Sequence, residues 1–496
     1  MTNYTVYLLF TVATVLSLAP VRGQEPALPE GLGDTSSSST VSSQSQDTEP
    51  ALPSGLDGGP EEPSLPAGLT NEREESPAKS LEKEDDQPRL LSWPPPLNVT
   101  GFLDSRLGYR TVGDDHQNAM SLGEFRLQLE TSRQAGPFFL TFAADLLYDY
   151  ENNDHGIDLE RGEGWFDLRE ANAGFTPFSF MDIKLGRQVL TWGTGDLIFI
   201  NDMFPKDWNS FFIGRDTEYL KAPSDAAKLS MYFDRAPNVD LIVTGRFDAD
   251  RFVDGRRVSF WNPMLQRRSG QDNPIDVDKP DEWIKDSEIA VRLFKNIQGY
   301  ELAAYAYRGF WKSPNGMNPA TGEFTFPDLS VYGASVRGTV LAGIGYIETG
   351  YYDSRNDRDG DDPTVANCEV HLLAGYEQEL WNNMTATAQY YIKHMMDHDE
   401  YLESLPPGFQ TADETRHTVT LRLHQTLLRE TLDINVFTRY SPTNNDMYIR
   451  PVVNYELTDN WFVEVGANFF LGNERHTFLN QFDRNDNIYV ATRYSF

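Results

Sequence analysis

The residues best suited to chemistry in this sequence are one cluster of histidines and aspartates and a long series of basic side chains. His394, Asp397, His398 and Asp399 are residue types that bind metal ions. A polar loop accounts for the same cluster, so we predict no metal site and no cofactor. No motif pairs a histidine with a serine or aspartate nucleophile. We therefore predict no catalytic residues and expect that the protein is not an enzyme.

The basic side chains recur at alternate positions within apolar segments. In residues 431–441, for example, Leu432, Ile434 and Val436 alternate with polar residues that include Arg439. A charged strand face is very costly in a dry core but ordinary where the strand lines water. The residues of this face that we expect to line a water-filled lumen are Arg106, Arg110, Arg126, Lys184, Lys228, Arg246, Arg292, Arg337, Lys393, Arg422, Arg439, Arg450 and Arg493.

This basic face has two interpretations. A basic wall concentrates anions and lowers the barrier to their entry, which favours a conduit for anionic solutes. Alternatively, the arginines pair with acids of the same face, such as Asp104, Asp433 and Glu464, and brace a wide barrel. The net charge of −33 makes nucleic acid an unsuitable partner for the surface as a whole.

Eighteen segments with period-two alternation are predicted to be β-strands. Charged residues recur on one face of most of them, although Arg308 and Glu348 do not fit the pattern. The predicted strands are 98–111, 121–133, 137–150, 165–176, 181–192, 226–235, 239–249, 287–296, 299–311, 329–340, 342–353, 367–381, 384–396, 416–428, 431–441, 447–457, 461–471 and 487–496.

The connections between these segments alternate between short and long. Tight turns such as Ile297-Gln298 and Asn382-Asn383 follow every second strand, and most other connections, such as 250–286, are long and polar. Transmembrane β-barrels are built in this way, with turns at one rim and loops at the other. We therefore predict that residues 93–496 form an all-β transmembrane antiparallel β-barrel of about 18 strands. Its exterior would contact outer-membrane lipid, and its lumen would admit hydrophilic solutes.

The last segment of the chain agrees with this fold. Ile488, Val490 and Phe496 share one face of the expected strand, whereas Tyr489 and Arg493 share the other. An apolar face that ends in a terminal phenylalanine resembles the closing strand of bacterial outer-membrane β-barrels. The resemblance implies a location in the outer membrane of a Gram-negative cell.

The connection 193–214 is long, aromatic and poorly suited to lie exposed in water. We expect it to fold inward as a constriction or plug, and a cap packed on neighbouring loops is the alternative. The residues assigned to this constriction loop are Asp196, Phe199, Asn201, Asp202, Phe204, Trp208, Phe211 and Phe212.

Together with Leu185-Gly-Arg-Gln188 and Trp192-Gly193, this connection resembles a passage of porin-like and alginate-export-like outer-membrane proteins. For an alginate exporter, the resemblance would imply an eighteen-stranded channel with an arginine-rich conduit for an anionic polysaccharide. The acidic extension at 24–92 departs from that pattern, so no substrate is carried over.

The N-terminal residues have a different composition. Residues 1–23 are predicted to be a signal peptide. Residues 24–92 are predicted to be a disordered acidic linker, because they cannot bury enough apolar surface to fold. The linker contains the pattern E-P-(A/S)-L-P-x-G-L three times, and we expect its leucines to bind a periplasmic transport protein; duplication within a spacer is the alternative. These leucines are Leu28, Leu32, Leu52, Leu56, Leu65 and Leu69.

The sequence thus leaves two functions open. The first is an outer-membrane porin-like channel that passes hydrophilic solutes, anionic solutes or polysaccharide among them. The second is a closed outer-membrane receptor or structural barrel that binds ligands through its extracellular loops. Single-channel conductance distinguishes the two, because only the channel conducts ions.

Overall fold

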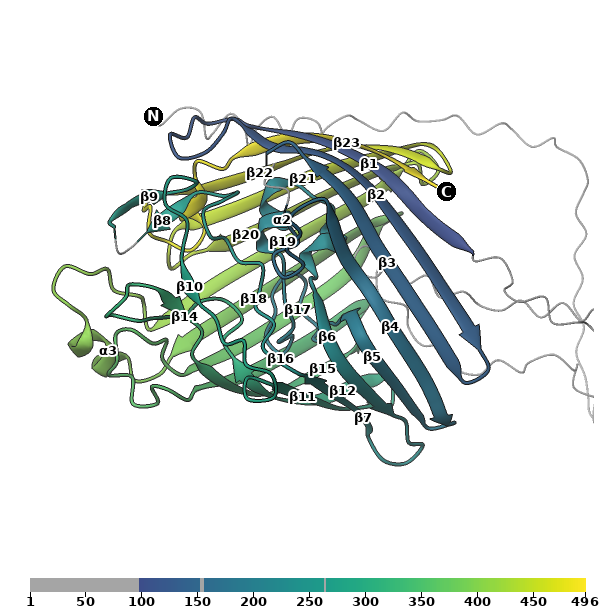
Figure 1. Ribbon diagram of the computed structural model, residues 1–496, viewed down its shortest axis with the longest axis horizontal. Coiled ribbons are helices and arrows are strands. Elements are labelled where there is room, and N and C mark those ends of the chain that lie inside the picture. Colours follow the sequence, from purple (N-terminus) through teal and green to yellow (C-terminus); the bar gives the residue numbers. More distant parts are fainter. Residues whose placement is uncertain (1–97, 152–155, 263–264) are drawn as a thin grey trace, which may run out of the picture. The chain divides into compact units, whose positions relative to one another are not determined.

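The computed structural model describes residues 98–151, 156–262 and 265–496. Eighteen strands in these ranges form one antiparallel sheet in which strands consecutive along the wall are paired. The sheet closes because β1 (Val99–Arg110) pairs with β23 (Asn487–Ser495) as well as with β2 (Met120–Ala135). The predicted all-β antiparallel barrel is confirmed (Figure 1).

All eighteen predicted strands are present. The prediction is wrong by several residues only at the ends of some strands. For example, β7 (Asn238–Thr244) was predicted to reach residue 249 but ends at Thr244, which pairs with Glu288 of β11 (Glu288–Ile297). The remaining wall strands are β3 (Phe138–Asp149), β4 (Phe166–Phe178), β5 (Met181–Val189), β6 (Pro223–Met231), β12 (Tyr300–Phe310), β15 (Asp328–Val340), β16 (Gly343–Ser354), β17 (Glu369–Trp381), β18 (Met384–Met395), β19 (Thr415–Leu427), β20 (Leu432–Ser441), β21 (Asp446–Thr458) and β22 (Trp461–Gly472).

Short elements lie within the long connections between wall strands. Two of them, α2 (Trp208–Ile213) and η1 (Thr217–Leu220), lie between β5 and β6. The others are β8 (Phe260–Asn262), β9 (Arg267–Ser269), β10 (Val277–Asp278), β13 (Gly316–Met317), β14 (Phe324–Thr325), α3 (His398–Ser404) and η2 (Asn480–Phe482). No helix among the described residues is long and apolar enough to cross a membrane.

Turns and loops are sorted to opposite rims of the barrel, here called the turn rim and the loop rim (Figure 1). At the turn rim, only Gln298 and Gly299 join β11 to β12, and both have positive φ, 54° and 84°. Two positive φ angles are what a type I′ hairpin turn requires. The long connections, such as the one that carries α3, emerge at the loop rim.

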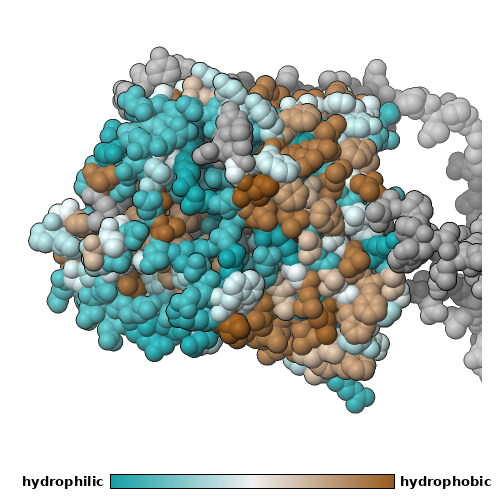
Figure 2. All heavy atoms as spheres, in the orientation of Figure 1, coloured by the Kyte–Doolittle hydropathy of each residue, from teal (hydrophilic) through white to brown (hydrophobic). Residues whose placement is uncertain are grey.

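The two faces of the wall differ in polarity. Outward-facing residues such as Leu185, Leu421 and Val490 are exposed. Figure 2 shows apolar residues gathered in a band over the strands. Inward-facing residues such as Asp104 and Glu464 are charged and buried. An apolar exterior around a polar interior is the pattern of barrels that cross a membrane. The predictions for residues 1–23 and 24–92 concern parts of the chain outside the described residues.

Candidate functional site

The chain between β5 and β6, residues 190–222, folds inside the barrel, and we call it the internal segment. Its central residues are buried: Ile200 is 0% exposed and Ile213 is 2% exposed. The segment is locally ordered by α2. The carboxylate of Asp207 caps this helix by accepting a hydrogen bond from the Ser210 amide at 2.7 Å, and Gly214 ends it with a left-handed φ of 97°.

One end of the internal segment packs on the wall formed by β6 to β18. Ile198, Ile200 and Phe204 belong to one apolar cluster with inward-facing residues of these strands, among them Leu329 of β15 and Leu373 of β17. The burial of several large apolar side chains contributes roughly 1.5–3 kcal/mol for each of them. This end of the segment is therefore held chiefly by hydrophobic packing.

The other end packs on a different part of the wall. Phe211 and Phe212 of α2 belong to a second apolar cluster with Tyr448 of β21, Phe470 of β22 and Leu122 of β2. The ring centroids of Phe212 and Phe470 are 5.2 Å apart in an edge-to-face arrangement. Because the two clusters lie on separate parts of the circumference, the internal segment extends across the lumen.

A buried carboxylate holds the segment near its start. Glu348 of β16 is 0% exposed and accepts four hydrogen bonds: from the amide and hydroxyl of Thr194 at 2.8 Å each, and from the amide and side chain of Asn201 at 2.9 Å each. Gly333 of β15 leaves room for this contact, because a Cβ there would lie 1.8 Å from the Asn201 side-chain oxygen. Glu348, which did not fit the sequence pattern, is thus an anchor of the internal segment.

A second anchor is an ion pair between the wall and the segment. The Arg422 guanidinium of β19 donates to both carboxylate oxygens of Asp196, at 2.5 and 2.7 Å. Bidentate pairs of this kind are among the stronger charge-assisted contacts in proteins. Arg422 was predicted to line the lumen and Asp196 to belong to the constriction loop, and the structure brings them together.

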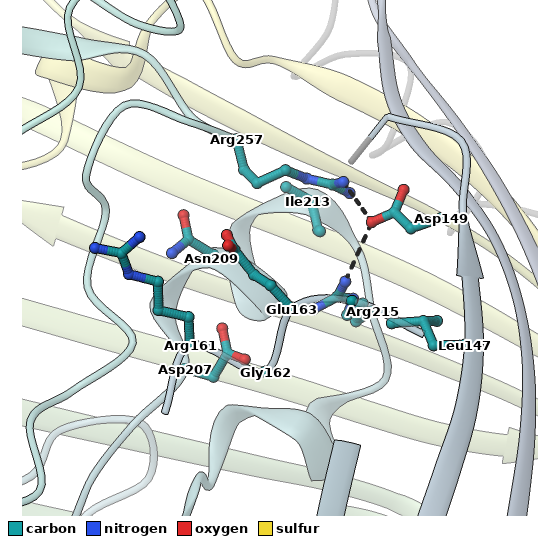
Figure 3. A pocket seen from close by; sticks show the side chains of 11 residues that line it. Leu147, Asp149, Arg161, Gly162, Glu163, Asp207, Asn209, Ile213, Arg215 and Arg257 are labelled. Atoms are coloured by element: carbon teal, nitrogen blue, oxygen red, sulfur yellow. Dashed lines mark hydrogen bonds and ion pairs between the residues drawn. The ribbon is translucent and has the colours of Figure 1, made fainter. Parts of the chain in front are cut away.

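The residues after α2 form a third set of anchors (Figure 3). Arg215 pairs with Glu124 of β2, its Nε donating at 2.7 Å, and lies 3.6 Å from Asp149 of β3. Asp149 also accepts a hydrogen bond from Arg257 at 2.5 Å. The cavity beside these groups has a volume of about 20 Å³, which is room for roughly one water molecule.

A fourth set of anchors involves the closing strands of the barrel. Arg493 of β23 lies 3.1 Å from Asp216 and 3.2 Å from Glu218 of the internal segment. Burial and the nearby Asp216 carboxylate raise the pKa of Glu218 to about 7. Arg106 of β1 donates to the Gly214 carbonyl at 3.1 Å and to Glu464 at 2.8 Å.

Two further inward-facing arginines contact the internal segment instead of lying free in the lumen. Arg450 of β21 donates to the Thr217 hydroxyl at 3.0 Å and to the Arg215 carbonyl at 3.1 Å. Arg126 of β2 pairs with Asp145 and stacks on the ring of Tyr219 at 4.0 Å. Five residues of the basic face thus contact the internal segment: Arg106, Arg126, Arg422, Arg450 and Arg493.

Other predicted lumen residues lie outside the anchors. Arg110 donates to backbone carbonyls, including that of Met120 at 2.8 Å. Three cations pair with acids of neighbouring strands: Lys184 with Glu170 at 3.6 Å, Arg292 with Glu301 at 2.6 Å, and Lys393 with Glu369 at 2.5 Å. Lys228, Arg337 and Arg439 are half-buried on strands β6, β15 and β20.

The placement of Arg246 on a strand is wrong. β7 ends at Thr244, and Arg246 lies beyond it in the loop, where it donates to Glu160 at 2.5 Å. The strand ends there because the chain leaves the wall to bond with other loops; the Asp250 amide, for example, donates to the Lys312 carbonyl at 2.8 Å.

The remaining residues assigned to the constriction loop also lie in the internal segment. Asp202 pairs with Lys206 at 2.9 Å, and the rings of Phe199 and Trp208 are 6.1 Å apart. The constriction loop expected from the sequence ends at residue 214 and leaves out the anchors Arg215 and Asp216. The signal available was their charge, directly after an apolar helix and before the next strand.

The histidines of the cluster His394, Asp397, His398 and Asp399 each form a hydrogen bond with a different part of the protein. His394 bonds to the Thr415 hydroxyl at 2.9 Å, and His398 bonds to the Ala412 carbonyl at 2.9 Å. Within the described ranges, no group of three or more His, Cys, Asp or Glu side chains is arranged to hold a metal ion.

The fold and the buried segment together define a closed barrel with a folded connection across its lumen. No protein-family model and no curated protein sequence matches this chain. Similar solved structures include Acinetobacter baumannii OccAB3, with a TM-score of 0.48, 9% identity and coverage of 80% of this chain and 99% of that chain. Pseudomonas aeruginosa OccK3 has a TM-score of 0.46 and 13% identity, with coverage of 80% of this chain and 96% of that chain. A mutant of the Rh. blastica porin has a TM-score of 0.37 and 10% identity, with coverage of 81% of this chain and 100% of that chain.

Proposed function

We propose that the protein is an outer-membrane channel for hydrophilic solutes, narrowed by its internal segment. The observation that supports this function is a closed eighteen-stranded wall with an apolar exterior and a charged interior. Such a wall separates hydrocarbon from water, and closure leaves no unpaired strand edge in the lipid. In this proposal the loop rim faces the outside of the cell and the turn rim faces the periplasm.

The distribution of exposed charge supports a hydrated path on the turn-rim side of the internal segment. Toward the turn rim, Lys184 and Glu170 form an ion pair that remains partly exposed. Arg292 and Glu301 form another, with side chains that are 18% and 41% exposed. Polar walls of this kind suit hydrophilic solutes rather than lipids.

We propose that a shift of the internal segment opens the channel. Its anchors are discrete contacts, such as those of Glu348 and Arg422, rather than a continuous sheet. Contacts of this kind can be broken one set at a time, so the segment has a small number of defined positions. Solutes would pass where the segment leaves the wall.

The experiment is a conductance measurement on the purified full chain in planar bilayers. Replacement of residues 195–213 by a short Gly/Ser linker removes the obstruction and leaves the wall strands intact. We expect small conductance steps for the wild type and clearly larger steps for this variant. Equal conductance of the two would refute the role of the internal segment.

A closed receptor or structural barrel is the second candidate. The observation that favours it is the packing of the internal segment on two parts of the wall through apolar clusters. In that case the loops at the loop rim would bind the ligand. Bilayers that stay silent with both the wild type and the linker variant would decide for this candidate.

The N-terminal residues extend the channel proposal. We propose that residues 24–92 lie in the periplasm and bind a transport protein through the leucines of the three repeats. Three weak copies on one flexible chain would act together by avidity. Deletion of two copies should lower the recruitment of the transport protein, and unchanged recruitment would refute the role of avidity.

A further inference from the structure

Two inward-facing arginines near the loop rim share one aromatic ring. Arg416 lies at the start of β19 and Arg439 near the end of β20, and both are half-buried. Their guanidinium carbons lie 4.9 and 4.8 Å from the centre of the Phe478 ring. Phe478 belongs to the connection between β22 and β23, so three separate parts of the chain meet at this point.

The hydrogen-bonding groups of these arginines are unused within the described part of the chain. Neither the Arg416 nor the Arg439 side chain forms an ion pair or hydrogen bond there, and the Nε of Arg416 is buried without a partner. Arg422 of the same strand, in contrast, is held by both oxygens of Asp196. The donors of both guanidinium groups are therefore available to a ligand that enters the lumen.

The acids near the pair form no ion pair with either arginine. Glu369 of β17 already binds Lys393 at 2.5 Å and His371 at 2.8 Å. Asp446 of β21 accepts a hydrogen bond from the Leu479 amide at 2.8 Å through Oδ2, which fixes the loop beside Phe478, and its Oδ1 has no hydrogen-bond partner among the described residues. The site therefore carries an excess of positive charge, in a chain whose net charge is −33.

We propose that Arg416 and Arg439 form a binding site for the carboxylate or phosphate group of an anionic solute that enters at the loop rim. A guanidinium presents a planar set of donors that matches the oxygens of either group. Phe478 holds the two side chains in place and leaves their N–H groups free for the ligand. The inference rests on the proposed channel function, since it names the solute class that the channel admits.

The test is isothermal titration of the detergent-solubilised full chain with malonate and, separately, with inorganic phosphate. The wild type should bind at least one of the two anions saturably. The double variant Arg416→Ala/Arg439→Ala should bind it at least about tenfold more weakly, because it loses two charge-assisted contacts. Binding of malonate alone assigns the site to carboxylates, and binding of phosphate alone assigns it to phosphates.

Two controls separate the site from general charge effects. Arg235→Ala removes one exposed positive charge at the turn rim and should leave the affinity unchanged. Arg416→Lys/Arg439→Lys keeps both charges but loses the planar donors, so its affinity should lie between those of the wild type and the double alanine variant. Heat-modifiable gel migration shows whether each variant retains a folded barrel.

The outcomes distinguish the site from the channel. Absence of saturable binding by the wild type, or equal binding by the double alanine variant, would overturn the site even if the protein conducts ions. A matching loss of affinity in Arg235→Ala would overturn it as well. Silent bilayers combined with anion binding that depends on Arg416 and Arg439 would leave the site standing and refute the channel.

Discussion

Glu348 offers the sharpest test of how the internal segment is held. Substitution Glu348→Ala removes the acceptor of two backbone amides, those of Thr194 and Asn201, and of two side-chain donors. A buried donor left without a partner costs about 1–3 kcal/mol. The loss of the acceptor for the two amides alone therefore destabilises the internal segment in its position on the wall by about 2–6 kcal/mol. Each 1.4 kcal/mol changes an equilibrium tenfold, so the population in which the internal segment is released from the wall should rise by about 30-fold or more.

Two measurements report on this change. Hydrogen exchange at residues 194–201 should become faster, because these amides lose their partner. The fraction of time that single channels spend in the larger conductance state should increase. Glu348→Gln keeps one accepting oxygen and should give an intermediate result in both measurements.

The matched control is Glu301→Ala, which removes another inward carboxylate that pairs with Arg292 and not with the internal segment. It should leave hydrogen exchange at 194–201 unchanged. If Glu348→Ala has wild-type exchange and wild-type conductance, the assignment of Glu348 as an anchor is refuted. If Glu301→Ala has the same effect as Glu348→Ala, the effect comes from lumen charge in general.

Three further predictions concern other contacts of the segment. Arg422→Ala should also increase the larger conductance state, by less than Glu348→Ala because its ion pair is partly exposed and worth about 1–2 kcal/mol; no change would contradict the anchor role. Gly333→Val should displace Asn201 and accelerate hydrogen exchange at its amide, since even a Cβ at this position would overlap the Asn201 side chain. If the Asn201 amide exchanges as slowly as in the wild type, strand β15 has moved to accommodate the valine. The raised pKa of Glu218, about 7 against an ordinary 4.5, means that the folded segment binds this proton more tightly than the unfolded one, so its stability falls as pH rises from about 4.5 through 7. Exchange at 215–222, corrected for intrinsic rates, should therefore be faster at pH 8 than at pH 6, and Glu218→Gln should remove the difference; a difference that persists in the variant would place its origin in another group.

The wall of the barrel was predictable because its signal is local. Period-two alternation, as in Ile488 and Val490 against Tyr489 and Arg493, follows from the geometry of a single strand. The short turn between β11 and β12 is likewise marked within a few residues of sequence by Gly299. Both features can be recognised without knowing which strands are neighbours.

The site was predictable only in part because its contacts join distant positions. Glu348 and Asn201 are 147 residues apart, and nothing in the surroundings of either residue indicates the other. Glu348 therefore looked like an exception to the strand pattern, although it is an anchor. Arg493 and Arg422 were recognised as inward-facing, but the sequence could not show that carboxylates of the internal segment bind them.

The contacts of β23 with the internal segment impose an order on the maturation of the protein. The Asn487 side chain donates to the Phe212 carbonyl at 3.0 Å, and Arg493 reaches Asp216 and Glu218. These partners exist only once the final strand has joined β1 and β22. A nascent barrel that still lacks this strand would keep the second half of its segment undocked, so the docked state marks a completed cylinder.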